Sequence, residues 1–150
     1  MEFSTKRFGT IEVKENQVLT FPEGLIGFQS FRRFVVMDLD NAGIFKWLQS
    51  LDDESLGFAI LDPKMVFRDY DPVFAEKDLD SLGAPDPGQL ILLCVATVPR
   101  DVRKMTVNLQ APLVINPSKR IGKQVITVMP EYTTKHQVFL PLQNLMKRTG

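Results

Sequence analysis

Apolar and polar side chains alternate along much of this chain, and the alternation is clearest over residues 105–110. A two-residue period is typical of a half-buried strand. Here one face would be apolar, with Met105, Val107 and Leu109, and the other polar, with Thr106, Asn108 and Gln110. Ala111-Pro112 then interrupts the strand, because proline has no N–H to donate. A short apolar run, 113–115, follows and ends at the turn Asn116-Pro117. The pattern predicts two short strands separated by a break.

Three amide side chains lie among these apolar residues: Asn108, Gln110 and Asn116. Burying an unpaired amide is costly, so each must have a hydrogen-bonding role. In one interpretation the amides bond to the local backbone where the strand is interrupted. In the other they form an exposed polar row that contacts a partner, and the sequence leaves both open.

Short strand-like segments punctuated by proline and glycine continue through the rest of the chain, at 11–13, 18–21, 34–37, 58–61, 90–98, 121–128 and 136–139. Residues 25–28 form a compact apolar corner, and 44–50 fit either a strand or a helical turn. We expect 117–120 to join 113–115 and 121–128 as a hairpin. The chain is therefore predicted to be mainly β: a compact, antiparallel-rich, barrel-like domain over 1–150 with one or two short helices.

Helical signals are few. Asp71-Pro72 has the form of an N-cap followed by proline at the first helical position, and it predicts a helix that stops at Gly83. A second candidate opens at Pro141, where Leu142, Leu145 and Met146 have helical spacing. We expect residues 141–150 to be a short helix or a flexible tail.

Composition places the chain among soluble globular proteins, with 150 residues, 44% hydrophobic and 24% charged. The longest apolar run, 90–96, is too short to span a bilayer, and the first residues lack the apolar core of a signal peptide. The one cysteine, Cys94, lies inside that run, which favours a buried, inert thiol. We therefore expect a cytoplasmic protein with no membrane partner.

Charge is unevenly distributed. Residues 38–86 carry twelve acidic and four basic side chains, a net charge of −8, and the flanks together carry +8. Such asymmetry steers a charged partner, although a mixed, solvated surface explains it equally well.

Residues for catalysis are scarce. His136 is the one histidine, so any histidine-dependent chemistry rests on it. No glycine-rich phosphate loop is present, and no metal or cofactor is predicted. The chain is thus predicted not to be an enzyme. One alternative is a small metal-dependent hydrolase using Asp52, Asp53 and Glu54. Another is a direct RNA-binding barrel that uses basic loops containing Arg100, Arg103, Lys104, Lys119, Arg120 and Lys123.

Three blocks, at 21–28, 48–50 and 106–116, resemble in order and spacing the flagellar assembly factor FliW family. The resemblance covers nearly the whole chain. It implies a small, cytoplasmic, β-rich barrel that is not catalytic and binds two protein partners. One is flagellin before its export, and the other is the translational repressor CsrA, whose repression of flagellin synthesis is thereby relieved. It implies no direct contact with nucleic acid, and we expect a monomer when free.

We expect the partners to contact residues of these blocks and the acidic turn beside them: Glu23, Leu48, Gln49, Ser50, Asp52, Asp53, Glu54, Asn108, Gln110 and Asn116. A strand edge at 48–50 would allow a partner segment to add a strand. The acidic middle of the chain would face the basic, RNA-binding repressor. The sequence leaves open whether the two partners share one surface.

Overall fold

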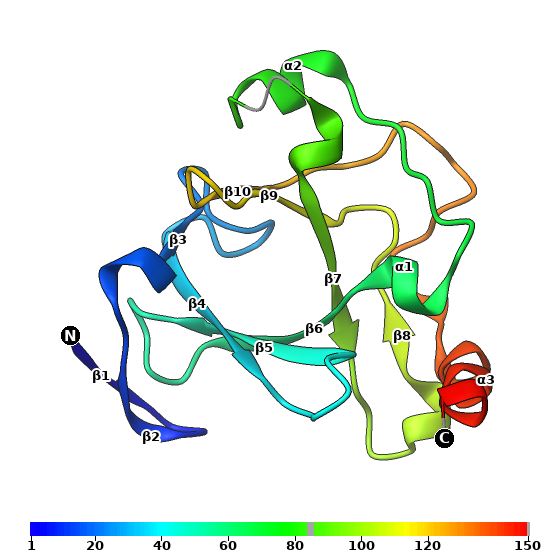
Figure 1. The fold of residues 1–150 in the computed structure, drawn as a ribbon, viewed down its shortest axis with the longest axis horizontal. Coiled ribbons are helices and arrows are strands. Elements are labelled where there is room, and N and C mark those ends of the chain that lie inside the picture. Colours follow the sequence, from blue (N-terminus) through cyan, green and yellow to red (C-terminus); the bar gives the residue numbers. More distant parts are fainter. Residues whose placement is uncertain (84–85, 150) are drawn as a thin grey trace.

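A computed structural model describes residues 1–83 and 86–149 of the chain (Figure 1). The described part is mainly β. Its strands are β1 Glu2–Thr5, β2 Gly9–Glu12, β3 Leu19–Thr20, β4 Arg33–Asp38, β5 Phe45–Ser50, β6 Gly57–Leu61, β7 Ile91–Thr97, β8 Thr106–Val107, β9 Leu113–Asn116, β10 Ile121–Gln124 and β11 His136–Gln137. Its α-helices are α1 Pro63–Val66, α2 Glu76–Asp80 and α3 Phe139–Thr149, and its 3-10 turns are η1 Glu15–Gln17, η2 Pro87–Gln89 and η3 Val102–Lys104.

Seven strands close into a barrel in the order β7-β6-β5-β4-β3-β10-β9, and β9 returns to pair with β7 (Figure 1). The pairings are antiparallel except that of β10 with β3. Closure leaves no long free edge within the ring. The predicted β-barrel is confirmed.

Strand β7 pairs with two partners on the same side. Its first half pairs with β9, where Leu93 is opposite Leu113, and its second half pairs with β8, where Ala96 is opposite Val107. Strand β8 ends at Val107, earlier than the alternation to 110 predicted, and the chain rejoins the ladder of β7 at Leu113, directly after Ala111-Pro112. The predicted break is confirmed, and it is the point at which β8 departs from the barrel to pair with β11.

The barrel interior is filled by a cluster of large apolar side chains: Phe21, Leu25, Phe34, Leu48, Ile60, Leu93, Leu113 and Ile115. Phe21 and Phe34 meet edge to face, with ring centroids 5.5 Å apart. Strand β10 has glycine at position 122, where a Cβ would collide with the Phe21 ring. The aromatic pair therefore fits inside the barrel because Gly122 has no side chain.

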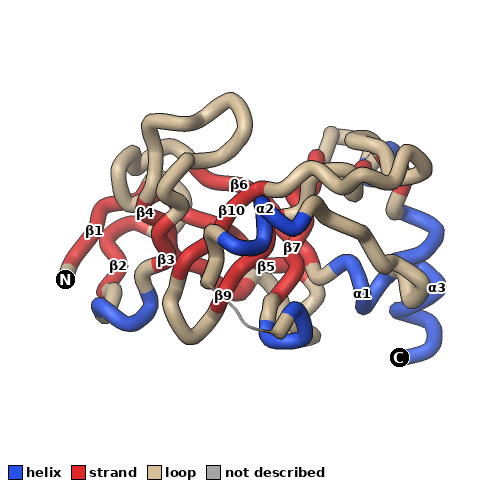
Figure 2. Tube along the Cα trace, turned by 90° about the horizontal axis from the view of Figure 1, so that it is seen from above, coloured by secondary structure: helices blue, strands red, loops and turns tan. Residues whose placement is uncertain are grey.

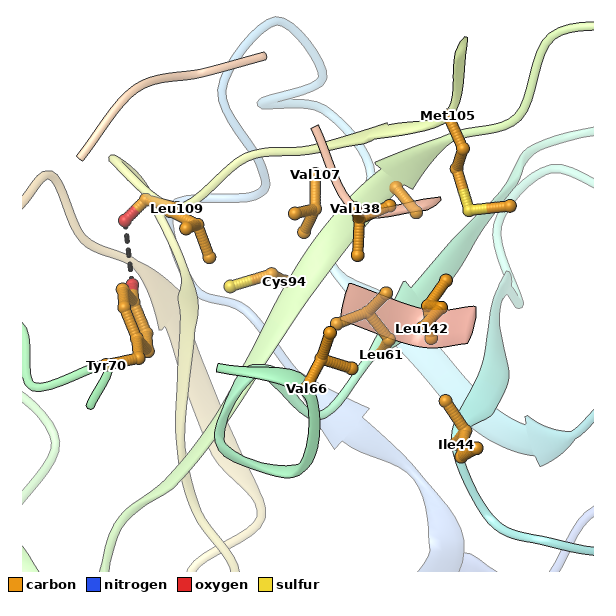
Figure 3. Close-up of a cluster of buried hydrophobic side chains, with 11 residues drawn as sticks. Ile44, Leu61, Val66, Tyr70, Cys94, Met105, Val107, Leu109, Val138 and Leu142 are labelled. Atoms are coloured by element: carbon orange, nitrogen blue, oxygen red, sulfur yellow. Dashed lines mark hydrogen bonds between the residues drawn. The ribbon is translucent and has the colours of Figure 1, made fainter. Parts of the chain in front are cut away.

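Two layers cover the outside of the barrel, and Figures 1 and 2 place them at opposite sides. The β1–β2 hairpin lies against β4 and β5, where Val13, Val35 and Leu51 form a small cluster. On the other side α1 and α3 lie against β6 and β7 and enclose a larger cluster (Figure 3): Ile44, Leu61, Val66, Tyr70, Cys94, Ala96, Met105, Val107, Leu109, Val138 and Leu142.

Cys94 is completely buried in this larger cluster, as predicted, and burial raises the pKa of its thiol to about 12. Tyr70 beside it donates a 2.7 Å hydrogen bond to the carbonyl of Leu109 (Figure 3). His136 packs edge to face on Phe67, with ring centroids 5.1 Å apart. Cys94 and His136 thus both pack against neighbouring side chains.

The predicted helix over 71–83 is wrong at its start, since α2 spans only Glu76–Asp80. Residues before it are extended because the carbonyl of Val73 accepts hydrogen bonds from Thr127 Oγ1 at 2.7 Å and from the backbone N–H of Val128 at 2.9 Å. Another aspartate–proline pair does begin a helix. Asp62 caps α1 by accepting a hydrogen bond from the N–H of Lys64, and Pro63 is the first residue of the helix.

Other boundaries shift by a few residues. Residues 45–50 form a strand, which decides an ambiguity left by the sequence pattern. Strand β10 stops at Gln124, short of the predicted 128, and β11 stops at Gln137 because α3 begins at Phe139. The tail is helical as expected, and Gly150 lies outside the described residues. Strand β1 was not predicted. No helix in the described part has the length and apolar character that a membrane crossing needs.

Candidate partner-binding site

Gln49, predicted to contact a partner, is a buried structural residue. Its side chain is 1% exposed. Its Nε2 donates to the carbonyls of Ser50, Glu54 and Leu56 at 3.1–3.3 Å, and its Oε1 accepts from Trp47 Nε1 at 3.0 Å. One amide therefore holds the turn that follows β5, since it bonds to three of the carbonyls in that segment.

The acidic turn is held by local bonds. Ser50 Oγ accepts from the N–H groups of Asp52 and Asp53, both at 3.0 Å. The Asp53 carboxylate accepts from the N–H and hydroxyl of Ser55. Glu54 is exposed, and its backbone carbonyl accepts from the N–H of Lys6 at 3.0 Å, which ties the β1–β2 hairpin to this turn.

Asp52 fastens the turn to the start of β4. Its Oδ2 accepts from the N–H groups of Arg32 and Arg33, and its Oδ1 pairs with the Arg33 guanidinium at 3.0 Å. Burial by itself would raise the pKa of Asp52, but these hydrogen bonds outweigh it and hold the pKa below the ordinary value of 3.8. The hydrogen bonds from Ser55 likewise lower the pKa of Asp53.

These bonds bear on two predictions. The described residues contain no group of three histidine, cysteine or acidic side chains able to hold a metal ion, so Asp52, Asp53 and Glu54 do not assemble the cation site of the hydrolase alternative. The predicted strand edge at 48–50 is wrong, since β5 pairs with β4 on one side and β6 on the other. Leu48 is completely buried in the barrel interior.

The three amides of block 106–116 do not all have the same role: some bond to the local backbone, and some are exposed, as the two interpretations allowed. Asn116 is buried and bonded: Nδ2 donates to the Leu82 carbonyl at 2.8 Å, and Oδ1 accepts from Ser118. Asn108 Oδ1 accepts from the N–H of Ala111 and closes the break. Asn108 Nδ2 and the Gln110 side chain make no hydrogen bond to other described residues, and both half-exposed residues line a pocket.

This rim pocket, of about 350 Å³, lies at the end of the barrel where β6 begins and β7 ends. It is lined by Leu25, Ile26, Phe28, Phe58, Val95, Asn108, Gln110, Ala111, Gln124, Ile126 and Thr134. The first and third sequence blocks meet here, although they are far apart in the chain. Gln124 joins them, since its Oε1 accepts from the N–H of Ile26 at 2.9 Å and its Nε2 donates to the carbonyl of Ala111 at 3.0 Å.

Large apolar side chains at the rim pocket are uncovered. Ile26 is 53% exposed and Ile126 is 57% exposed. Phe28 is 37% exposed and contacts the inward-facing Phe58 edge to face, with centroids 5.2 Å apart. Grouped exposed apolar side chains with a few unsatisfied amides are typical of a surface that binds another molecule.

The remaining predicted residue, Glu23, lies apart from the acidic turn. It pairs with Lys123 at 3.4 Å, and the same ammonium contacts Asp78 at 3.1 Å. Burial by itself would lower the pKa of Lys123, but these two carboxylates outweigh it and raise the pKa. Lys123, counted among the basic residues of the RNA-binding alternative, is therefore neutralised, as is Arg103 by Asp101.

Sequence reasoning thus located two separate regions, the acidic turn and the rim pocket, and missed the apolar side chains that make the pocket a site. Ile26 and Phe28 lay inside a recognised block but were assigned to a corner. Gln124 ends β10 and Ile126 follows it, and a pattern that predicted a strand to 128 gave no sign that this segment borders a pocket.

The fold and the rim pocket define a small β-barrel with a candidate binding surface. The chain belongs to the FliW family: the family model described as FliW protein matches residues 2–138.

Relatives and a solved structure agree. The flagellar assembly factor FliW of Natranaerobius thermophilus is 38% identical over 140 residues, which cover 93% of each chain. That of Geobacter sulfurreducens is 37% identical over 139 residues, covering 93% of this chain and 87% of the relative. A crystal structure of the flagellar assembly factor FliW superposes with a TM-score of 0.86 at 35% identity, covering 93% of this chain and 97% of that one.

Replacing Gln49 by leucine, which has no hydrogen-bonding group, should lower the free energy of unfolding by about 2 kcal/mol. The change removes the bonds to three carbonyls and leaves the Trp47 N–H without its acceptor. Urea denaturation measures this. The matched control is Gln143→Leu on the exposed face of α3, which should change stability by less than about 0.5 kcal/mol. Equal effects of the two changes would contradict the structural role of Gln49.

Replacing Asp52 by asparagine should lower the free energy of unfolding by about 1 kcal/mol near neutral pH. A carboxyl whose pKa is lowered by folding stabilises the protein above its unfolded pKa, and this contribution is lost as the pH falls through the folded pKa. The two proteins should therefore converge in stability under acid conditions, in denaturation curves recorded across the acid range. Exposed Asp69→Asn is the control, and a difference that persists in acid would refute the charge argument.

Proposed function

We propose that this protein is a non-catalytic flagellar assembly factor that binds flagellin and antagonises the repressor CsrA by exchange of partners. Membership of the FliW family supports the role, since the relatives carry the name flagellar assembly factor. When flagellin is abundant it occupies the protein, CsrA is released, and flagellin synthesis falls.

The observation that carries the proposal is that two of the three sequence blocks typical of the family, 21–28 and 106–116, converge on the rim pocket and leave apolar side chains uncovered there. An uncovered apolar surface lined by free amides suits a protein segment, because apolar side chains bind in the pocket and the amides pair with peptide groups. We assign flagellin to this pocket.

CsrA binds RNA and therefore presents cationic surface, which suits the acidic turn better than an apolar pocket. In that turn the Asp52 and Asp53 carboxylates are engaged in hydrogen bonds with their neighbours. Glu54 is exposed and its side chain makes no hydrogen bond or ion pair with other described residues. We therefore assign Glu54 as the residue of the turn that attracts the repressor.

Calorimetric titration with CsrA of the same organism, before and after saturation with flagellin, tests the exchange. Binding of CsrA that flagellin abolishes is the expected result. Binding that flagellin leaves intact would show two independent sites and refute partner exchange. If neither partner bound at micromolar concentration, the proposed function would be wrong.

Replacing Ile126 by aspartate should weaken flagellin binding about tenfold, because a carboxylate in the rim pocket must be desolvated. The side chain is exposed, so the fold should be unaffected. Calorimetry measures the affinity. Ile91→Asp is the matched control: it is 44% exposed at the opposite end of the barrel and should bind flagellin as the wild type does. Equal affinity of both variants would exclude the rim pocket.

Reversing the charge of Glu54 to lysine should slow CsrA association several-fold at low salt, and the difference should shrink as added salt screens the charges. Stopped-flow association at several ionic strengths measures this. Glu131→Lys, an exposed reversal outside the acidic middle, is the control. Association rates that match the wild type at every ionic strength would exclude the acidic turn as the steering surface.

A further inference from the structure

A second and larger recess, of about 850 Å³, lies on the outer face of the barrel. We call it the tryptophan groove; its main lining residues are Arg7, Phe45, Trp47, Ala59, Val98 and Met105. Side chains alternate along β5, so the buried Leu48 faces the interior and Trp47 faces outward. The groove therefore occupies outer strand surface that is left between the β1–β2 hairpin and the helical layer.

The floor of the groove is shaped by Trp47 and Gly57. A Cβ at position 57 would collide with the indole of Trp47, so the ring lies against bare backbone of β6. The indole N–H is fixed by Gln49, 3.0 Å away. Trp47 is the one tryptophan in the sequence. A broad, fixed aromatic surface of this kind is typical of the centre of a protein interface.

One cation points into this groove. The guanidinium carbon of Arg7 lies 4.5 Å from the centroid of the Trp47 ring and 5.8 Å from that of Phe8. Arg7 makes no ion pair within the described residues. Asp40, the acidic residue in the lining, accepts instead from the backbone N–H groups of Ile44 and Phe45 at 3.1 and 2.9 Å. An anion from outside would therefore find Arg7 oriented on an aromatic surface and free to pair.

The groove borders the rim pocket, because Phe58 and Val95 line both. Exposed Val98, with 51% of its surface accessible, lies farther along the same stretch of chain. A segment that binds at Ile126 and continues past the rim of the barrel would thus come next to the groove.

We propose that the tryptophan groove is the second half of the flagellin site: it binds an apolar segment of flagellin that carries an aspartate or glutamate, whose carboxylate pairs with the Arg7 guanidinium. This rests on the proposed function and adds the surface and the charge that the bound segment must have. A basic protein such as CsrA fits this groove poorly, since Arg7 repels cations and the acidic residue of the lining, Asp40, is engaged in backbone hydrogen bonds.

Incorporation of 5-fluorotryptophan tests occupancy directly, because the fluorine resonance of a chain with one tryptophan reports on the groove alone. Unlabelled monomeric flagellin of the same organism is added, and CsrA in a second titration. We expect flagellin to shift the resonance in step with binding measured by calorimetry, and CsrA to leave it in place.

Variants test the charge and the surface. Arg7→Gln and Val98→Asp should each weaken flagellin binding about tenfold, Arg7→Lys should keep part of the affinity, and CsrA affinity should change less than about threefold. The matched controls are Arg68→Gln, an exposed arginine between α1 and α2, and Ile91→Asp at the opposite end of β7. All the substituted side chains are exposed, so folding is preserved, and thermal melting checks it.

The possible outcomes distinguish an error in the groove assignment from an error in the proposed function. If flagellin bound the wild type but neither moved the resonance nor distinguished Arg7→Gln from Arg68→Gln, the groove assignment would be wrong and the proposed function would stand. A response to CsrA in place of flagellin would overturn the assignment as well. If flagellin did not bind the wild type at all, both the groove assignment and flagellin binding would fail.

Discussion

The pairing of one strand, β7, with two different partners determines how this molecule is built. Its first half closes the barrel through β9, and its second half pairs with β8 outside the ring. The two pairings differ in register, so the chain between β8 and β9 must leave the ladder of β7. The chain leaves this ladder after Asn108, whose N–H still donates to the Val95 carbonyl, and the carboxamide of Asn108 supplies the Ala111 N–H with an acceptor that the ladder no longer provides. Closure of the barrel therefore depends on a break between β8 and β9 in which the Ala111 N–H still has a hydrogen-bond acceptor.

The binding surface is a consequence of that break. Where β8 and β9 separate, the end of the barrel is not sealed by sheet, and the corner at 25–28 lies across it, held by the two hydrogen bonds of Gln124. The corner covers the interior only partly, so Ile26 and Phe28 remain exposed beside Ile126. The corner thus contributes Leu25 to the core and leaves Ile26 and Phe28 exposed at the rim pocket.

A buried amide governs the other end of the proposed surface. Gln49 bonds both to the turn after β5 and to the indole of Trp47. That turn is bonded to the β1–β2 hairpin, because the N–H of Lys6 donates to the carbonyl of Glu54. Arg7 is carried by that hairpin. The acidic turn assigned to the repressor and the cationic end of the groove are consequently neighbours, so a flagellin segment lying over Arg7 would come close to bound CsrA. This proximity offers a physical basis for exchange of the two partners.

The sequence by itself determined the mainly β fold, most strand positions, the break at Ala111-Pro112, the buried cysteine and the family, because side-chain periodicity and proline act locally along the chain. It also singled out the amides and the acidic turn, but not what they do. Whether Gln49 faces a partner or the interior depends on the strands that neighbour β5. The helix predicted from Asp71-Pro72 does not form there, because Val73 is bonded to a segment more than fifty residues away. The rim pocket and the tryptophan groove likewise exist only where distant segments meet, so the tertiary structure alone decided the site.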